Sequence, residues 1–266
     1  MGQSKLLAWA LATELRALRD ETGLSLARAG ALLERSSESV RKWETGENAP
    51  DSLSIDGIAR RYKQSDDYRR YLLALRRERD SLNFFSRHVF EPRILFLAEQ
   101  RYPLMRKFEP MYIPGVLQIK EYHYSDITRD DRVARDRVAT VWSLIEDRQK
   151  VLFNRSDLRV EIVIGQAALQ FMEGHACRDD QIERLREAVD RGWSIQVMPT
   201  PNGLMKSGFD LYLSEREQRG PYAPSFAYYE APDTSEYVEE PSRVENYEAL
   251  FDTVQRLSKP LEEYLC

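Results

Sequence analysis

The chain has 266 residues, of which 42% are hydrophobic and 31% charged, and its formal net charge is −5 at pH 7. This length is too great for one small helical bundle, so we expect a small domain joined to a larger one with its own core. No apolar run reaches the ~18 residues of a membrane span and no secretory signal opens the sequence, so we expect a cytoplasmic protein without membrane contact.

The amino-terminal region shows the pattern of short capped helices. Gly23 can end the first helix in the left-handed conformation. Ser25 can cap a second helix by accepting a backbone N–H bond, and Ser36 can cap a third helix, which Gly46 ends. The segment Leu24–Pro50 is therefore typical of a helix-turn-helix that docks on DNA. The first helix is predicted by leucines at helical spacing, namely Leu7, Leu11, Leu15 and Leu18.

The third of these helices has one apolar face and one polar, partly basic face. Val40 and Trp43 share the apolar face at i, i+3 spacing. Arg41 can bond a guanine in bidentate fashion, and Arg41 or Lys42 can neutralise a phosphate, although a solvated helix face is the alternative. Glu38 can accept a hydrogen bond from cytosine, or can repel phosphate and only help to cap the helix. The predicted DNA-binding residues are Ser25, Ser36, Ser37, Glu38, Ser39, Arg41 and Lys42.

Two more helices are predicted to follow. Ile55, Ile58 and Ala59 indicate a fourth helix, and Asp66–Leu82 indicates a connecting helix with one apolar side and many arginines. The connecting helix either extends the DNA-binding domain or forms a dimer seam. The expected division is a helix-turn-helix domain over residues 1–65, a connecting helix and linker over 66–90, and a regulatory and partner-binding domain over 91–266.

Residues 5–63 resemble the xenobiotic-response-element type of helix-turn-helix regulators, relatives of phage repressors. The matching residues are Leu24, Ser25, Ser36, Val40, Trp43, Glu44, Gly46, Ala49 and Pro50. The chain departs from that pattern at Leu26, where a glutamine is usual, at Ala29 and Gly30, and at Glu34, where a turn glycine is usual. Residues 1–82 carry 15 basic and 13 acidic side chains, a small excess that predicts modest, dimer-dependent affinity for double-stranded DNA.

The remaining sequence mixes helical and strand patterns. Helices are predicted over residues 93–109, 131–153, 166–171, 181–191 and 244–257, and strands over 159–164, 195–198, 209–213, 226–230 and 237–239. The expected fold class is therefore α+β, with an all-α helix-turn-helix bundle followed by a mixed α and β domain.

Three residues are candidates for partner or ligand binding in this second domain. Gln118 follows the sharp turn Pro114–Gly115, and its amide can satisfy either buried backbone groups or a ligand. Tyr228 and Tyr229 belong to an aromatic cluster that can line a pocket or form an ordinary sheet face. The other members of the cluster are Tyr222, Phe226 and Tyr237.

No pattern of catalytic, cofactor or metal-binding residues stands out. His175 and Cys177 lie close in sequence but lack further ligands, and the two cysteines, Cys177 and Cys266, give no disulfide framework. A P-loop, a G-x-S-x-G elbow and an H-E-x-x-H helix are all missing from the sequence. We therefore expect no enzymatic activity and no cofactor.

The carboxy-terminal region resembles that of actinobacterial WhiJ-like transcriptional regulators over residues 91–263. The resemblance is carried by Phe108–Tyr122, Asp147–Leu152, Ile195–Pro199 and Tyr228–Pro232, with departures at Ile119 and Gln166. It implies a link to developmental timing and antibiotic production. Together with the helix-turn-helix it leads us to expect a homodimeric regulator of developmental or antibiotic-related genes, with repression rather than activation as the expected output. It also implies control by a small protein encoded by an adjacent gene, as in toxin–antitoxin pairs. An alternative is that the helix-turn-helix docks protein rather than DNA.

Overall fold

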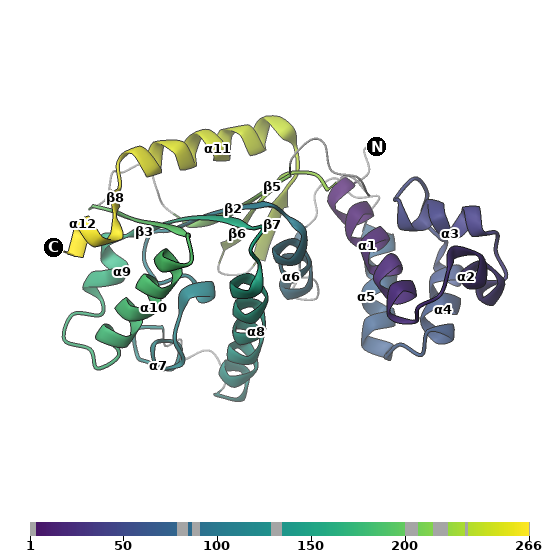
Figure 1. Ribbon diagram of the computed structural model, residues 1–266, viewed down its shortest axis with the longest axis horizontal. Helices are drawn as coiled ribbons and strands as arrows, with labels where there is room; N and C mark the ends of the chain where they lie inside the picture. The colour runs from purple at the N-terminus through teal and green to yellow at the C-terminus, as the bar shows by residue number, and fades with distance from the viewer. Residues whose placement is uncertain are drawn as a thin grey trace. The chain divides into compact units, whose positions relative to one another are not determined.

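The computed structural model describes residues 4–78, 85–86, 91–128, 135–199, 207–214, 223–231 and 234–265. The chain forms two compact units (Figure 1). The first unit contains residues 1–94 and 214–225, and the second contains residues 95–213 and 226–266. The first is helical and the second combines a sheet with helices, which confirms the predicted α+β class.

The first unit is a bundle of short helices whose starts are fixed locally. Its helices are α1 (Lys5–Glu21), α2 (Leu26–Leu33), α3 (Ser37–Glu44), α4 (Ser52–Arg61) and α5 (Asp66–Glu78), and the two-residue strand β1 (Phe85–Ser86) follows. Each of the helices α1 to α4 begins after a residue whose side-chain oxygen accepts a backbone N–H bond. These capping residues are Ser4, Ser25, Ser36 and Asp51.

Apolar side chains from all parts of the bundle form its core. Five leucines of α1 are buried together with Val40 and Trp43 of α3 and Ile55 and Ile58 of α4. Helix α5 packs on α1 and α4 and buries Leu72. It therefore forms part of this bundle.

The second unit is built around a mixed sheet with the strand order β7-β6-β5-β2-β3-β4-β8. Strands β2, β3 and β4 run parallel to one another, and the remaining neighbours are antiparallel. The strands are β2 (Leu104–Glu109), β3 (Arg159–Gly165), β4 (Ser194–Met198), β5 (Phe209–Leu213), β6 (Phe226–Ala231), β7 (Thr234–Val238) and β8 (Lys259–Pro260).

Helices cover both faces of this sheet. Helix α11 lies on one face, and α8 and α10 lie on the other (Figure 1). On the α11 side, Phe108, Phe209, Leu211, Phe251 and Val254 form a buried cluster. The helices of this unit are α6 (Glu91–Arg101, of which Leu95 onward belongs to the unit), η1 (Gly115–Leu117), α7 (Lys120–His123), α8 (Arg135–Asn154), α9 (Gln166–Gln170), α10 (Arg178–Asp190), α11 (Pro241–Arg256) and α12 (Leu261–Leu265).

One predicted element is wrong. The helix predicted over residues 93–109 ends at Arg101, and Leu104–Glu109 form β2 between β5 and β3. Pro103 separates the helix from the strand, because proline cannot continue the helical hydrogen bonding. Strand β7 also begins earlier than predicted, at Thr234. Residues 131–134 of the predicted long helix lie outside the described residues.

Where the structure describes helices, none combines the length and the apolar character that crossing a bilayer requires.

Candidate nucleic-acid interface

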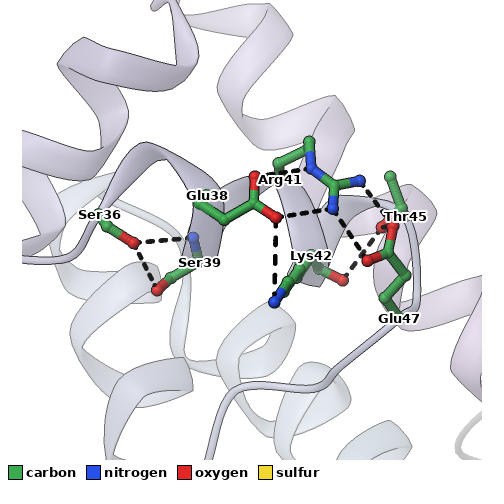
Figure 2. Close-up of polar contacts among 7 residues, drawn as sticks. All are labelled: Ser36, Glu38, Ser39, Arg41, Lys42, Thr45 and Glu47. Atoms are coloured by element: carbon green, nitrogen blue, oxygen red, sulfur yellow. Dashed lines mark hydrogen bonds and ion pairs between the residues drawn. The ribbon is translucent and has the colours of Figure 1, made fainter.

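The polar face of α3 is open to solvent because its apolar face packs in the core of the bundle. Val40 and Trp43 are 3% and 8% exposed. At the start of the helix, the Ser36 hydroxyl oxygen accepts a hydrogen bond from the Ser39 backbone N–H at 3.0 Å and lies 2.8 Å from the Ser39 hydroxyl (Figure 2). Ser36 and Ser39 are thus committed mainly to capping, whereas Ser37 is exposed.

Helix α3 is also tied to the end of α1 by a part-buried ion pair. The Arg19 guanidinium donates from Nε to Glu44 Oε1 at 2.8 Å and from Nη2 to Glu44 Oε2 at 2.9 Å. Its Nη1 donates to the Leu24 carbonyl at 2.9 Å. A bidentate pair of this kind fixes orientation as well as adding energy. It therefore holds the carboxyl end of α3 against the chain segment that leads into α2.

The turn between α2 and α3 uses two close backbone arrangements. A Cβ atom at Gly30 would lie 2.7 Å from the Arg35 carbonyl oxygen, so only glycine fits there without a shift. Glu34 has a φ of 54°, the left-handed conformation, which is uncommon for residues other than glycine. Its carboxylate pairs with Arg61 of α4 at 2.8 Å. Ser25 is exposed, and its hydroxyl accepts a bond from the Arg28 N–H at 3.3 Å.

Arg41, the predicted guanine contact, is held by two carboxylates (Figure 2). Its Nε and Nη2 donate to Glu38 at 2.9 and 2.8 Å, and its Nη1 and Nη2 donate to Glu47 at 2.6 and 2.9 Å. The hydrogen bonds from Arg41 lower the pKa of both carboxyl groups. Lys42 Nζ lies 3.9 Å from Glu38 Oε1. The charges on this face therefore compensate one another.

Sequence reasoning missed Glu47, which lies beyond the end of α3. Gly46 has a φ of 74°, and this left-handed turn redirects the chain after the helix. The Thr45 hydroxyl donates to Glu47 Oε1 at 3.1 Å. A glycine with an acidic residue directly after it was the signal available in the sequence.

Comparison with known families gives two matches. A model described as a domain of unknown function (DUF5753) matches residues 93–263, and a model described as a helix-turn-helix domain matches residues 10–72. The chain belongs to the DUF5753 family. The helix-turn-helix domain indicates that this DUF5753 protein is a DNA-binding regulator of transcription. No curated protein and no solved structure matches the chain.

Within the DUF5753 domain, Gln118 belongs to a buried network of glutamines. Its Nε2 donates to the Ile113 carbonyl at 2.7 Å. Gln149 Nε2 donates to the Gln118 carbonyl at 2.8 Å, and Gln181 Nε2 donates to the Leu117 carbonyl at 2.8 Å. These amides satisfy backbone carbonyls on both sides of the turn at Pro114–Gly115. The Gln118 side chain is therefore engaged with backbone in this structure.

Tyr228 and Tyr229 of the DUF5753 domain belong to different surroundings. Tyr228 is buried, and its hydroxyl donates to Glu230 at 2.7 Å. Tyr229 packs beside the buried cluster under α11, and its hydrogen bond to Glu236 raises its pKa to about 12. Successive residues of a strand point to opposite faces. The two tyrosines thus do not line one pocket together, and Tyr222 lies outside the described residues.

In this DUF5753 protein, His175 lies between Cys177 and Asp126 and contacts both. His175 Nδ1 lies 3.1 Å from Cys177 Sγ, and His175 Nε2 lies 3.0 Å from Asp126 Oδ1. Burial raises the pKa of the Cys177 thiol. Within the described ranges, no group of three His, Cys, Asp or Glu side chains has an arrangement that could hold a metal ion.

The raised pKa of Cys177 predicts that its thiol reacts slowly with alkylating reagents. Because the thiolate is the reactive form, alkylation by iodoacetamide at pH 8 is expected to be roughly tenfold slower than alkylation of free cysteine. The rate should rise with pH, as the thiolate fraction grows, and should reach the free-cysteine value in urea. Mass spectrometry of a Cys266→Ser variant would follow this single thiol. Alkylation as fast as that of free cysteine in the folded protein would contradict the prediction.

Proposed function

We propose that this DUF5753 protein is a homodimeric, sequence-specific transcriptional repressor. The observation that supports this most is the polar face of α3, which presents Ser37, Glu38, Arg41 and Lys42 above a buried apolar face in a capped helix-turn-helix. In a dimer, two such helices can enter successive major grooves about 34 Å apart on a near-palindromic operator.

The DUF5753 domain is proposed to receive the signal rather than to catalyse a reaction. We propose as its input a small protein encoded by an adjacent gene, and as the controlled genes those for development or antibiotic production. This part of the proposal is supported by the resemblance to WhiJ-like regulators. Its test is a pull-down of the adjacent gene's product by the purified protein, followed by release of operator DNA when that product is added.

DNA binding is tested by anisotropy titration with the DNA upstream of the protein's own gene, a scrambled duplex and a range of salt concentrations. Specific, salt-sensitive binding is expected. The Arg41→Ala/Lys42→Ala variant should lose operator binding, because guanine and phosphate contacts are both removed. Its circular dichroism should match that of the wild type, since both side chains are on the open face of α3. Wild-type affinity in this variant would contradict the proposed contact surface.

A second candidate function is that the helix-turn-helix docks protein rather than DNA. The observation that favours it is the compensation of Arg41 by Glu38 and Glu47, which weakens the attraction for phosphate. Equal or absent binding to the upstream and scrambled duplexes, together with capture of the adjacent gene's product, would support this alternative.

A further inference from the structure

The ion cluster of Arg41, Glu38 and Glu47 lies on the face that is proposed to meet DNA. Its side chains are 38%, 57% and 49% exposed, so a ligand can reach all three. Arg41 makes four hydrogen bonds within the cluster, and its guanidinium has five N–H donors in all. In the free protein, almost the whole donor capacity of Arg41 is therefore used before DNA arrives.

This cluster is poorly suited to phosphate. The three side chains carry a net charge of −1, and Lys42, 3.9 Å from Glu38, brings the face only to neutrality. A phosphate is negative and offers only acceptors, so it would satisfy Arg41 while being repelled by Glu38 and Glu47. If Arg41 turned to a phosphate, the phosphate would also supply no hydrogen-bond donor to replace Arg41 at either carboxylate. Arg41 should consequently contribute little to sequence-independent binding, which depends on phosphate neutralisation.

A G·C base pair offers what the phosphate lacks. Its major-groove edge is uncharged and presents the guanine O6 and N7 acceptors beside the cytosine N4 amino donor. Arg41 can donate to the guanine while Glu38 accepts from the cytosine, so that both partners of the i, i+3 pair keep a hydrogen bond. An A·T pair gives no such match, because the adenine N6 donor lies between two acceptors, adenine N7 and thymine O4, so no two adjacent acceptors are left for a bidentate contact from Arg41.

We propose that the negative charges of Glu38 and Glu47, called the counter-charge below, disfavour binding of Arg41 to phosphate and favour its binding to a G·C pair. This inference rests on the proposed DNA-binding function. Glu38 is the residue that shares the base pair, and Glu47 is a positioning residue that holds the guanidinium from beyond the end of α3. The bond from the Thr45 hydroxyl and the left-handed turn at Gly46 keep Glu47 in place.

A double-mutant cycle tests the counter-charge. Anisotropy titrations of the full chain with a scrambled duplex, over a range of salt, would compare the wild type, Arg41→Ala, Glu38→Gln/Glu47→Gln and the triple variant. The double Gln variant should bind roughly three- to tenfold more tightly, and its slope of log affinity against log salt should steepen by about 0.9, the value of one added phosphate contact. In the double Gln background, Arg41→Ala should reverse both effects. In the wild-type background, Arg41→Ala should weaken binding to the scrambled duplex far less.

The matched control is Asp66→Asn/Asp67→Asn, which makes the same change of charge. These two aspartates are exposed and pair with Arg69 and Arg70 on α5, outside α3. The control should leave the salt slope at its wild-type value. If Arg41→Ala had the same effect in both backgrounds, Arg41 would be an ordinary phosphate contact and the counter-charge would be overturned.

Selection from a pool of randomised duplexes tests the base pair. The wild type and the Asp66→Asn/Asp67→Asn control should enrich a sequence with a G·C pair at one position, and Glu38→Gln should lose roughly tenfold of that preference. An unchanged preference in Glu38→Gln would overturn this inference but leave the proposed function intact. If the wild type enriched no sequence at all, the proposed function itself would fail.

Discussion

Replacement of Arg148 by methionine is expected to destabilise the DUF5753 domain by about 3–5 kcal/mol, the usual result of removing one partner of a buried ion pair. The Glu99 side chain is fully buried, and Arg148 is 18% exposed. Arg148 Nε donates to both Glu99 oxygens at 3.0 and 2.9 Å. The Tyr212 hydroxyl, 3.4 Å from Glu99, is a weak substitute. Without Arg148, the carboxylate is left buried and without its cation.

Urea unfolding, monitored by hydrogen exchange of the β2 and β5 amides, would measure this loss of stability in the DUF5753 domain. The matched control is Lys150→Met on the same helix, because Lys150 is 61% exposed and pairs with Glu146 and Asp147, two exposed acids of α8. We expect that control to leave the free energy of unfolding nearly unchanged. A double variant, Glu99→Leu/Arg148→Met, should regain most of the lost stability, since it leaves no uncompensated charge. An Arg148→Met domain as stable as the control would contradict the expected role of the pair.

The ion pair also shows which features a single sequence can predict. The starts of α2 and α3 were predictable because Ser25 and Ser36 cap helices that begin at the next residue. Glu99 and Arg148 come from helices that are far apart in sequence, and no local pattern marks them as partners. Their pairing depends on how α6 and α8 pack on the same side of β5, which is a property of the tertiary structure.

Strand β2 was missed for a related reason. Its residues, L-M-R-K-F-E, follow an apolar helical segment and are themselves compatible with a helix. Only pairing with β3 and β5 on its two sides makes them a strand. For the candidate residues in the DUF5753 domain, strand alternation alone places Tyr228 and Tyr229 on opposite faces of β6. In α3, the apolar and polar faces were predictable from the residue spacing, but the compensation of Arg41 by Glu47 required the geometry of the turn at Gly46.

A Gly165→Ala substitution is expected to destabilise the DUF5753 domain by more than about 3 kcal/mol, the upper range for overpacking. Gly165 ends β3, and a Cβ atom there would lie 2.0 Å from the carbonyl oxygen of Pro110, just after β2. Relief requires the backbones of β2 and β3 to separate at this end, where the two strands are paired up to Glu109 and Ile164.

The matched control for Gly165→Ala is Gly115→Ala, whose added Cβ would lie 3.5 Å from Ile145 Cδ1, an ordinary van der Waals distance. This control should retain close to wild-type stability in the same urea and hydrogen-exchange measurement. A Gly165→Ala domain as stable as the control would show that Pro110 can move away without cost. In that case the close approach of Gly165 and Pro110 would not be needed to hold β2 in the sheet. The hydrogen bonds of β2 to β3 and β5 would suffice.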